Sequence, residues 1–125
     1  MPTVVVDASA IAAVLFGEVG ASEVQDRLRG MNLIAPVLLR HELVSVALKN
    51  MRLDAARRAE LTLALRRYPA LGVVEREVVP AAVFTLALAT GLSAYDTSCL
   101  WLARNLGVEL VTLDGELAAA AALAP

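Results

Sequence analysis

The sequence contains few of the residues that build disulfides and zinc sites. Its 125 residues include one cysteine, Cys99, and one histidine, His41. A single cysteine cannot form an internal disulfide, which is typical of proteins from a reducing cytoplasm. A conventional zinc cluster needs several cysteine or histidine ligands at short spacing, so these two residues exclude one.

Aromatic residues and an excess of positive charge are also lacking. Aromatics make up 4% of the chain, so a core of alanine, valine and leucine is expected. Eleven basic residues against thirteen acidic ones give a net charge of −2, which argues against the cationic field of a duplex DNA binder. A hydrophobic content of 58% excludes a disordered chain. The length, without linker or repeat, predicts one domain over residues 1–125.

The longest uncharged stretch, residues 78–95, reaches the lower limit for a membrane-spanning helix. Pro80 and Gly91 divide it, and the remaining helical piece of roughly 11 residues is too short to cross a bilayer. The stretch therefore predicts a buried strand end followed by a core helix. Because the first basic residue is Arg27, no secretory leader is expected, and the sequence predicts a cytoplasmic protein without a membrane segment.

Strand-like and helix-like segments alternate along the chain. The run Val4-Val5-Val6 is apolar on both faces, as in a central parallel strand covered by helices on both sides. Further strands are predicted near residues 33–35, 72–75 and 109–113. Helices are predicted over residues 8–16, 18–28, 37–51, 54–67, 81–89 and 94–106, and after residue 114. This order predicts an α/β class with three α/β/α layers and a parallel sheet of four or five strands.

Four of the thirteen carboxylates have unusual positions. Asp7 and Asp114 each follow a predicted strand, at the sheet edge where open parallel sheets bind ligands. Asp96 in the first turn of its helix and Glu42 in the third long helix both have apolar neighbours at helical spacing. Taken singly, each acid could also be an ordinary helix cap or a charge that favours the helix dipole.

Gathering these carboxylates requires a counter-charge. Two carboxylates about 5 Å apart repel by roughly 3 kcal/mol at an effective dielectric of 20. A hard divalent cation would remove this repulsion, and oxygen ligands without thiolate or imidazole favour Mg²⁺ or Mn²⁺ over zinc. Such an ion beside a phosphate group leads to metal-assisted phosphodiester hydrolysis.

The order of four short motifs resembles that of the PIN-domain nucleases. These motifs are Val-Val-Asp-Ala-Ser at residues 5–9, Glu42, Ala-Tyr-Asp-Thr-Ser at residues 94–98 and Leu-Val-Thr-Leu-Asp at residues 110–114. Within the family, the compact chain is similar to VapC-type toxins of toxin–antitoxin pairs. The resemblance implies an acidic metal site with Mg²⁺ or Mn²⁺ formed by Asp7, Glu42, Asp96 and Asp114, with supporting hydroxyls from Ser9 and Thr112.

The resemblance also implies an activity and partners. It implies Mg²⁺-dependent endonucleolytic cleavage of single-stranded RNA, a homodimer, and a VapB-like antitoxin that inserts a segment over the site. The family commonly has a short final strand after the helix that follows the fourth acid. Residues 117–125 are rich in alanine and contain no β-branched run, which leaves open whether a fifth strand forms.

The middle of the chain is basic. Eight basic and four acidic residues lie between Arg40 and Arg76, and the two helices predicted there could guide a phosphate backbone toward the acidic site. The alternative is an ordinary solvated helix surface. We expect His41 at the surface and Cys99 in the core, and Trp101 in either the core or a dimer contact.

Four other functions compete with a toxin. A housekeeping RNA-processing nuclease or a non-catalytic α/β scaffold could share the same fold. A phosphotransfer enzyme of the haloacid dehalogenase type needs a second aspartate two residues after the first, where this chain has Ser9. A receiver-like signalling module needs an extra acid pair near the first strand and a lysine after the last, and neither is present.

Overall fold

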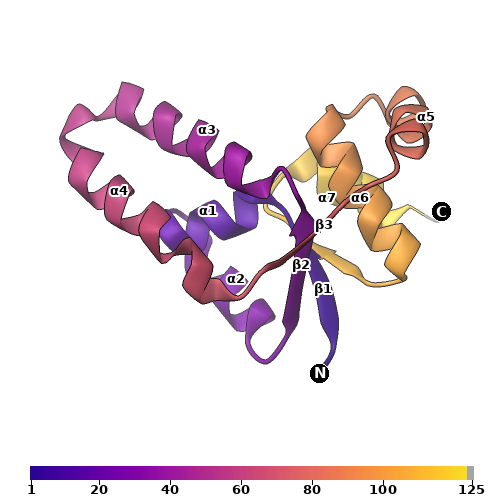
Figure 1. Cartoon of the computed structure of the whole chain (residues 1–125), viewed down its shortest axis with the longest axis horizontal. Coiled ribbons are helices and arrows are strands. Elements are labelled where there is room, and N and C mark those ends of the chain that lie inside the picture. The colour runs from indigo at the N-terminus through magenta and orange to yellow at the C-terminus, as the bar shows by residue number, and fades with distance from the viewer. Residues whose placement is uncertain (124–125) are drawn as a thin grey trace.

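The computed structural model describes residues 1–123 and shows a parallel sheet of four strands between two groups of helices (Figure 1). The strand order is β3-β2-β1-β4, and every neighbouring pair is parallel. The strands are β1 (Thr3–Val6), β2 (Asn32–Pro36), β3 (Val74–Arg76) and β4 (Glu109–Val111).

The helices divide between the two sides of the sheet (Figure 1). One group comprises α1 (Ala8–Phe16), α2 (Ala21–Leu28), α3 (Leu39–Leu53), the short 3₁₀ helix η1 (Ala55–Arg57) and α4 (Arg58–Arg67). The other comprises α5 (Pro80–Thr90), α6 (Ala94–Leu106) and α7 (Gly115–Ala122). A second 3₁₀ helix, η2 (Tyr68–Leu71), leads from α4 to β3. The helices α3 and α4 form a hairpin, residues 39–67, that projects away from the sheet; we call it the arm (Figure 1).

The core lies on both faces of the central strand. Val4, Val5 and Val6 of β1 are all buried, because helices cover the strand from each side. The largest fully buried side chains include Ile11 of α1 and Leu100 of α6, which come from the two opposite layers. Aliphatic side chains thus supply most of the packing, as the low aromatic content predicts.

The predicted fold class is confirmed, with differences at the ends of elements. The third strand covers Val74–Arg76 instead of 72–75, and the third long helix covers Leu39–Leu53 instead of 37–51. The predicted helix 54–67 is divided into η1 and α4. Within residues 1–123 the sheet has four strands, and the last two residues of the expected 1–125 domain lie outside the described part.

The prediction of a strand end and a core helix in residues 78–95 is wrong. No strand forms at residues 78–79, and Val83 is the only buried residue of α5. Phe84 and Leu88 are 65% and 71% exposed, because α5 packs on α6 at the periphery and not on the sheet. The apolar composition predicted the helix correctly, but it did not predict that the helix lies at the periphery. Among residues 1–123, no helix has the length and apolar character needed to span a bilayer.

Candidate active site

The site lies where the order of the strands reverses. The chain runs from β1 outward to β2 and β3, and then returns to place β4 on the other side of β1. The carboxyl ends of β1 and β4 therefore lie side by side, and ligands of open α/β sheets bind at this kind of position. Asp7 directly follows β1, and Thr112 and Asp114 follow β4.

Asp7 is a buried carboxylate with four hydrogen-bond contacts. Its side chain is the N-cap of α1, where Oδ1 accepts the Ala10 backbone N–H at 3.0 Å. The Ser9 hydroxyl lies 2.8 Å from Oδ1 and 3.0 Å from Oδ2, and donates to this carboxylate. The Thr112 hydroxyl donates to Oδ2 at 2.5 Å. With only 2% of Asp7 exposed, these donors replace the water that the carboxylate loses on burial.

The two hydroxyls also join the ends of the strands. Ser9 Oγ accepts the Leu113 backbone N–H at 2.9 Å, and Thr112 Oγ1 accepts the Asp114 backbone N–H at 3.0 Å. The two hydroxyl oxygens are 3.2 Å apart. Each hydroxyl thus donates to Asp7 and accepts from the turn after β4, so the position of Asp7 is fixed relative to Asp114.

All four predicted acids lie at the N-terminal ends of helices. Asp114 is the N-cap of α7, and its Oδ1 accepts the Leu117 N–H at 2.8 Å. Asp96 lies in the first turn of α6, and Glu42 lies in the first turn of α3. Helix N-termini carry partial positive charge, which offsets part of the repulsion among the carboxylates.

The electrostatic coupling shows that the four acids share one region. Burial raises the pKa of Asp7 above its ordinary value, with a further contribution from the charge of Asp114, although hydrogen bonds from Thr112, Ala10 and Ser9 oppose the rise. Burial also raises the pKa of Asp96, and the charges of Asp114, Asp7 and Glu42 add to it. No basic side chain is among the causes of either shift.

The donor chemistry of this region fits Mg²⁺ or Mn²⁺. Carboxylate and hydroxyl oxygens are the ligands that hard divalent cations prefer. A cation would relieve the repulsion that adds to the effect of burial on the pKa of Asp96. As the side chains stand, no three acidic, histidine or cysteine residues within 1–123 are arranged so that they could hold an ion. The carboxylates therefore fit the ion by their chemistry, and would have to draw closer together to bind it.

Comparison with known proteins gives the family. Residues 4–123 match the family model of the PIN domain. The chain belongs to the PIN-domain family. The crystal structure of PAE2754 from Pyrobaculum aerophilum is similar, with a TM-score of 0.74 and 25% sequence identity over 94% of this chain and 84% of that one. No curated protein matches the chain.

PIN domains are generally metal-dependent nucleases that use Mg²⁺ or Mn²⁺, so the family confirms the predicted nuclease-type fold. In this PIN domain, the structure brings Ser9 and Thr112 into direct contact with Asp7. It places Asp114, Asp7 and Glu42 within electrostatic reach of Asp96. The catalytic role of these residues stays a prediction.

The residues outside the acidic site have simpler positions. His41 is exposed, Cys99 is fully buried, and Trp101 is partly buried against the core. The motifs did not predict the Leu113 backbone N–H as a donor to Ser9, because main-chain donors leave no trace in side-chain patterns. The ion pair of Arg40 with Glu75 was not predicted either, because it joins two elements that are far apart in the sequence.

Proposed function

We propose that this PIN domain is a Mg²⁺-dependent endoribonuclease that cleaves single-stranded RNA. One observation carries the proposal: four acids from four helix N-termini share one edge of the sheet, and no basic side chain balances them. Burial raises the pKa of Asp96, and the charges of Asp114, Asp7 and Glu42 add to the rise. A structural cluster of this kind would usually contain an arginine or lysine. A site for a divalent cation needs none, because the ion supplies the positive charge.

Each acid has a proposed role. Asp7, Asp96 and Asp114 would hold the ion, and Glu42 would hold a second ion or orient a water molecule. Ser9 and Thr112 act as positioning residues, because they fix the carboxylate of Asp7 through hydrogen bonds. When bound, the ion would activate water toward the phosphodiester and stabilise the departing oxygen.

The biological role that we propose is the toxin of a type II toxin–antitoxin system. The compact chain and its motifs resemble VapC-type toxins, which implies a cytoplasmic protein, a homodimer and a VapB-like antitoxin as partner. The exposed side chains of Phe84 and Leu88 on α5 support a further partner surface, since burial of such apolar groups favours association. A housekeeping RNA-processing nuclease would use the same acids, and growth arrest on expression would distinguish the toxin from it.

The decisive experiment measures RNA cleavage and its dependence on a divalent ion. Purified protein is incubated with mixed single-stranded RNA in Mg²⁺, in Mn²⁺ and in EDTA. We expect cleavage in the first two and none in EDTA. Asp7→Asn keeps the shape of the side chain but removes its charge, and should abolish cleavage. Asp26→Asn is the matched control, because Asp26 is exposed on α2 and pairs with Arg29.

Two results would contradict the proposal. The first is wild-type protein that cleaves no RNA with any divalent cation. The second is Asp7→Asn protein that cleaves as fast as the wild type. Loss of cleavage in both variants would instead point to damage unrelated to the site, and a thermal melt of each variant tests for it.

A further inference from the structure

The unpaired basic side chains are concentrated in one part of the chain. Arg27, Arg29, Arg40 and Arg57 form ion pairs with acidic side chains, and Arg104 donates to the Ala120 carbonyl. Within residues 1–123, six basic residues make no ion pair, and they all lie between residues 49 and 76: Lys49, Arg52, Arg58, Arg66, Arg67 and Arg76. All six are exposed.

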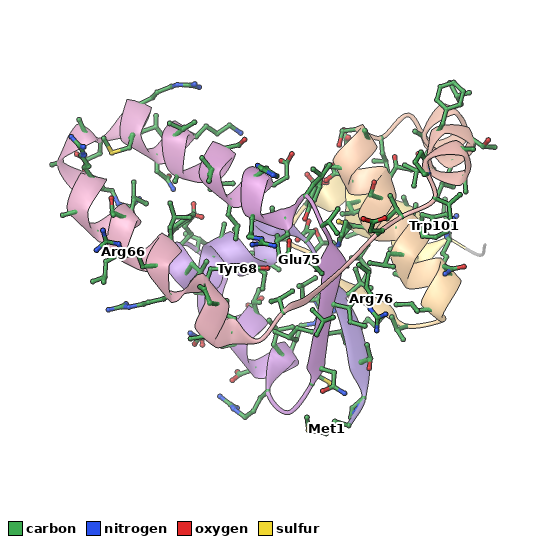
Figure 2. All side chains as sticks on the ribbon, in the orientation of Figure 1. Met1, Arg66, Tyr68, Glu75, Arg76 and Trp101 are labelled. Carbon is green, nitrogen blue, oxygen red and sulfur yellow. The ribbon has the colours of Figure 1, made fainter. Side chains whose placement is uncertain are left out.

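Five of these six cations belong to the arm, residues 39–67. The sixth, Arg76, ends β3 at the sheet, whereas Arg66 lies near the C-terminal end of α4 (Figure 2). The acidic groups of the arm do little to neutralise them. Asp54 caps η1, Glu60 pairs with Arg57, and Glu42 lies at the opposite end of α3. The arm therefore carries excess positive charge in a protein that is negative overall.

A groove extends from beside the acidic site to one of these cations, Lys49. It has a volume of about 370 Å³ and runs between α1 and α3. Ser9 and Leu113 line it beside the acidic site, and Lys49 and Leu53 line it on α3. Its walls are mostly apolar, and Glu18 is its one acidic residue, which interacts with Arg57 on the arm.

The spacing along α3 fits a path from the site to the arm. Lys49 lies seven residues after Glu42, so the two side chains share one helix face about 10 Å apart along the axis. Arg52 lies one turn further along the same side of the helix. An RNA strand that leaves the acidic site along this helix face would meet Lys49 first and then Arg52.

We infer that single-stranded RNA leaves the acidic site along the groove between α1 and α3, and that Lys49 and Arg52 contact its phosphates. This inference rests on the proposed nuclease function. A polyanion with regularly spaced charges fits a row of unpaired cations along a helix, and such contacts add affinity without reading sequence. The chain has few aromatic residues for base stacking, so these phosphate contacts would provide most of the binding along the arm.

The test measures how RNA binding depends on salt, in EDTA so that no cleavage occurs. Each phosphate contact contributes about −0.7 to the slope of log K against log salt concentration for a single strand. The double variant Lys49→Gln/Arg52→Gln should therefore bind a labelled RNA oligonucleotide with a slope about 1.4 units shallower than wild type. The double variant Arg27→Gln/Arg29→Gln also removes two positive charges, but from paired side chains at the C-terminal end of α2, and should keep the wild-type slope.

The outcomes separate this inference from the proposed function. An unchanged slope in the Lys49/Arg52 variant, or an equal change in both double variants, overturns the inference even if wild-type protein cleaves RNA in Mg²⁺. Wild-type protein that binds vesicles of anionic lipid through Lys49 and Arg52, but binds no RNA, overturns it in favour of a membrane surface. Far-ultraviolet circular dichroism and thermal melts of both variants confirm that α3 still forms.

Discussion

The contact of the Thr112 hydroxyl with Asp7 makes a quantitative prediction about stability. Thr112→Val keeps the branched shape of the side chain and removes the hydroxyl, which donates to Asp7 Oδ2 and accepts the Asp114 N–H. Thr112 is 8% exposed and Asp7 is 2% exposed, so water does not readily replace the lost group. The variant should unfold more easily in the absence of metal.

The expected loss follows from the two hydrogen bonds. A hydrogen bond to a charged group contributes about 1.5–3 kcal/mol, and a buried N–H left without an acceptor costs about 1–3 kcal/mol. We therefore expect Thr112→Val to lower the free energy of unfolding by about 3 kcal/mol at pH 7. Ser9→Ala should cost less, about 2 kcal/mol, because it loses the hydrogen bond to Asp7 but the Leu113 N–H that it leaves without a partner is exposed to water.

Urea denaturation at pH 7 in EDTA measures both effects. A double-mutant cycle with Asp7→Asn isolates the interaction between Thr112 and Asp7, and the coupling energy should exceed about 1 kcal/mol. A Thr112→Val protein within about 0.5 kcal/mol of wild type would refute the reasoning, since a surface substitution costs no more than that. Equal effects of Thr112→Val in the wild-type and Asp7→Asn backgrounds would show that the two side chains do not act together.

Three further predictions concern charge, metal and backbone. The pKa values of Asp7 and Asp96 are raised in the folded protein. Without metal, the two residues therefore contribute fully to the free energy of unfolding below the ordinary aspartate pKa, and this contribution falls as pH rises through the raised pKa values. Urea titrations across pH should show this fall, and Asp7→Asn should reduce it. Mg²⁺ at 100 times its dissociation constant should stabilise wild type by about 2.7 kcal/mol, and Asp96→Asn should weaken this gain in thermal melts. Gly20→Ala should destabilise by about 1–2 kcal/mol, because Gly20 has φ +91° and a Cβ would lie 3.0 Å from Leu113, whereas Gly115→Ala, with open space and no such φ, should not.

Local sequence predicted where the acids would lie in relation to strands and helices. A β-branched run followed by Asp7, and a Leu-Val-Thr-Leu run followed by Asp114, both predict a carboxylate at the end of a strand. Both strands form, although β4 ends at Val111 instead of Leu113. The neighbouring placement of these two strands could not be predicted in the same way. It depends on the pairing of β1 with β4, between segments about 105 residues apart, and no local pattern records such pairing.

The structure also shows what composition alone leaves out. The apolar helix α5 was expected in the core, but Phe84 and Leu88 are exposed, because an apolar helix can face either a core or a partner. Similarly, the positions of Lys49 and Arg52 in the sequence do not tell whether an acidic side chain neutralises them. That depends on which residues of other elements come close, as Glu75 does for Arg40.

The burial of Cys99 gives this protein an internal reporter. Its thiol is fully buried on α6, and burial raises its pKa, with a smaller contribution from the charges of Asp7 and Asp96. It is the only thiol in the chain, so a reagent that modifies cysteine has one target. Because the reagent needs both exposure and the thiolate, its rate follows how often α6 separates from the sheet. If Asp96 of α6 and Asp7 beside β1 both hold an ion, as proposed, its binding would slow this separation, and a simple colorimetric time course would then follow occupancy of the site without any RNA.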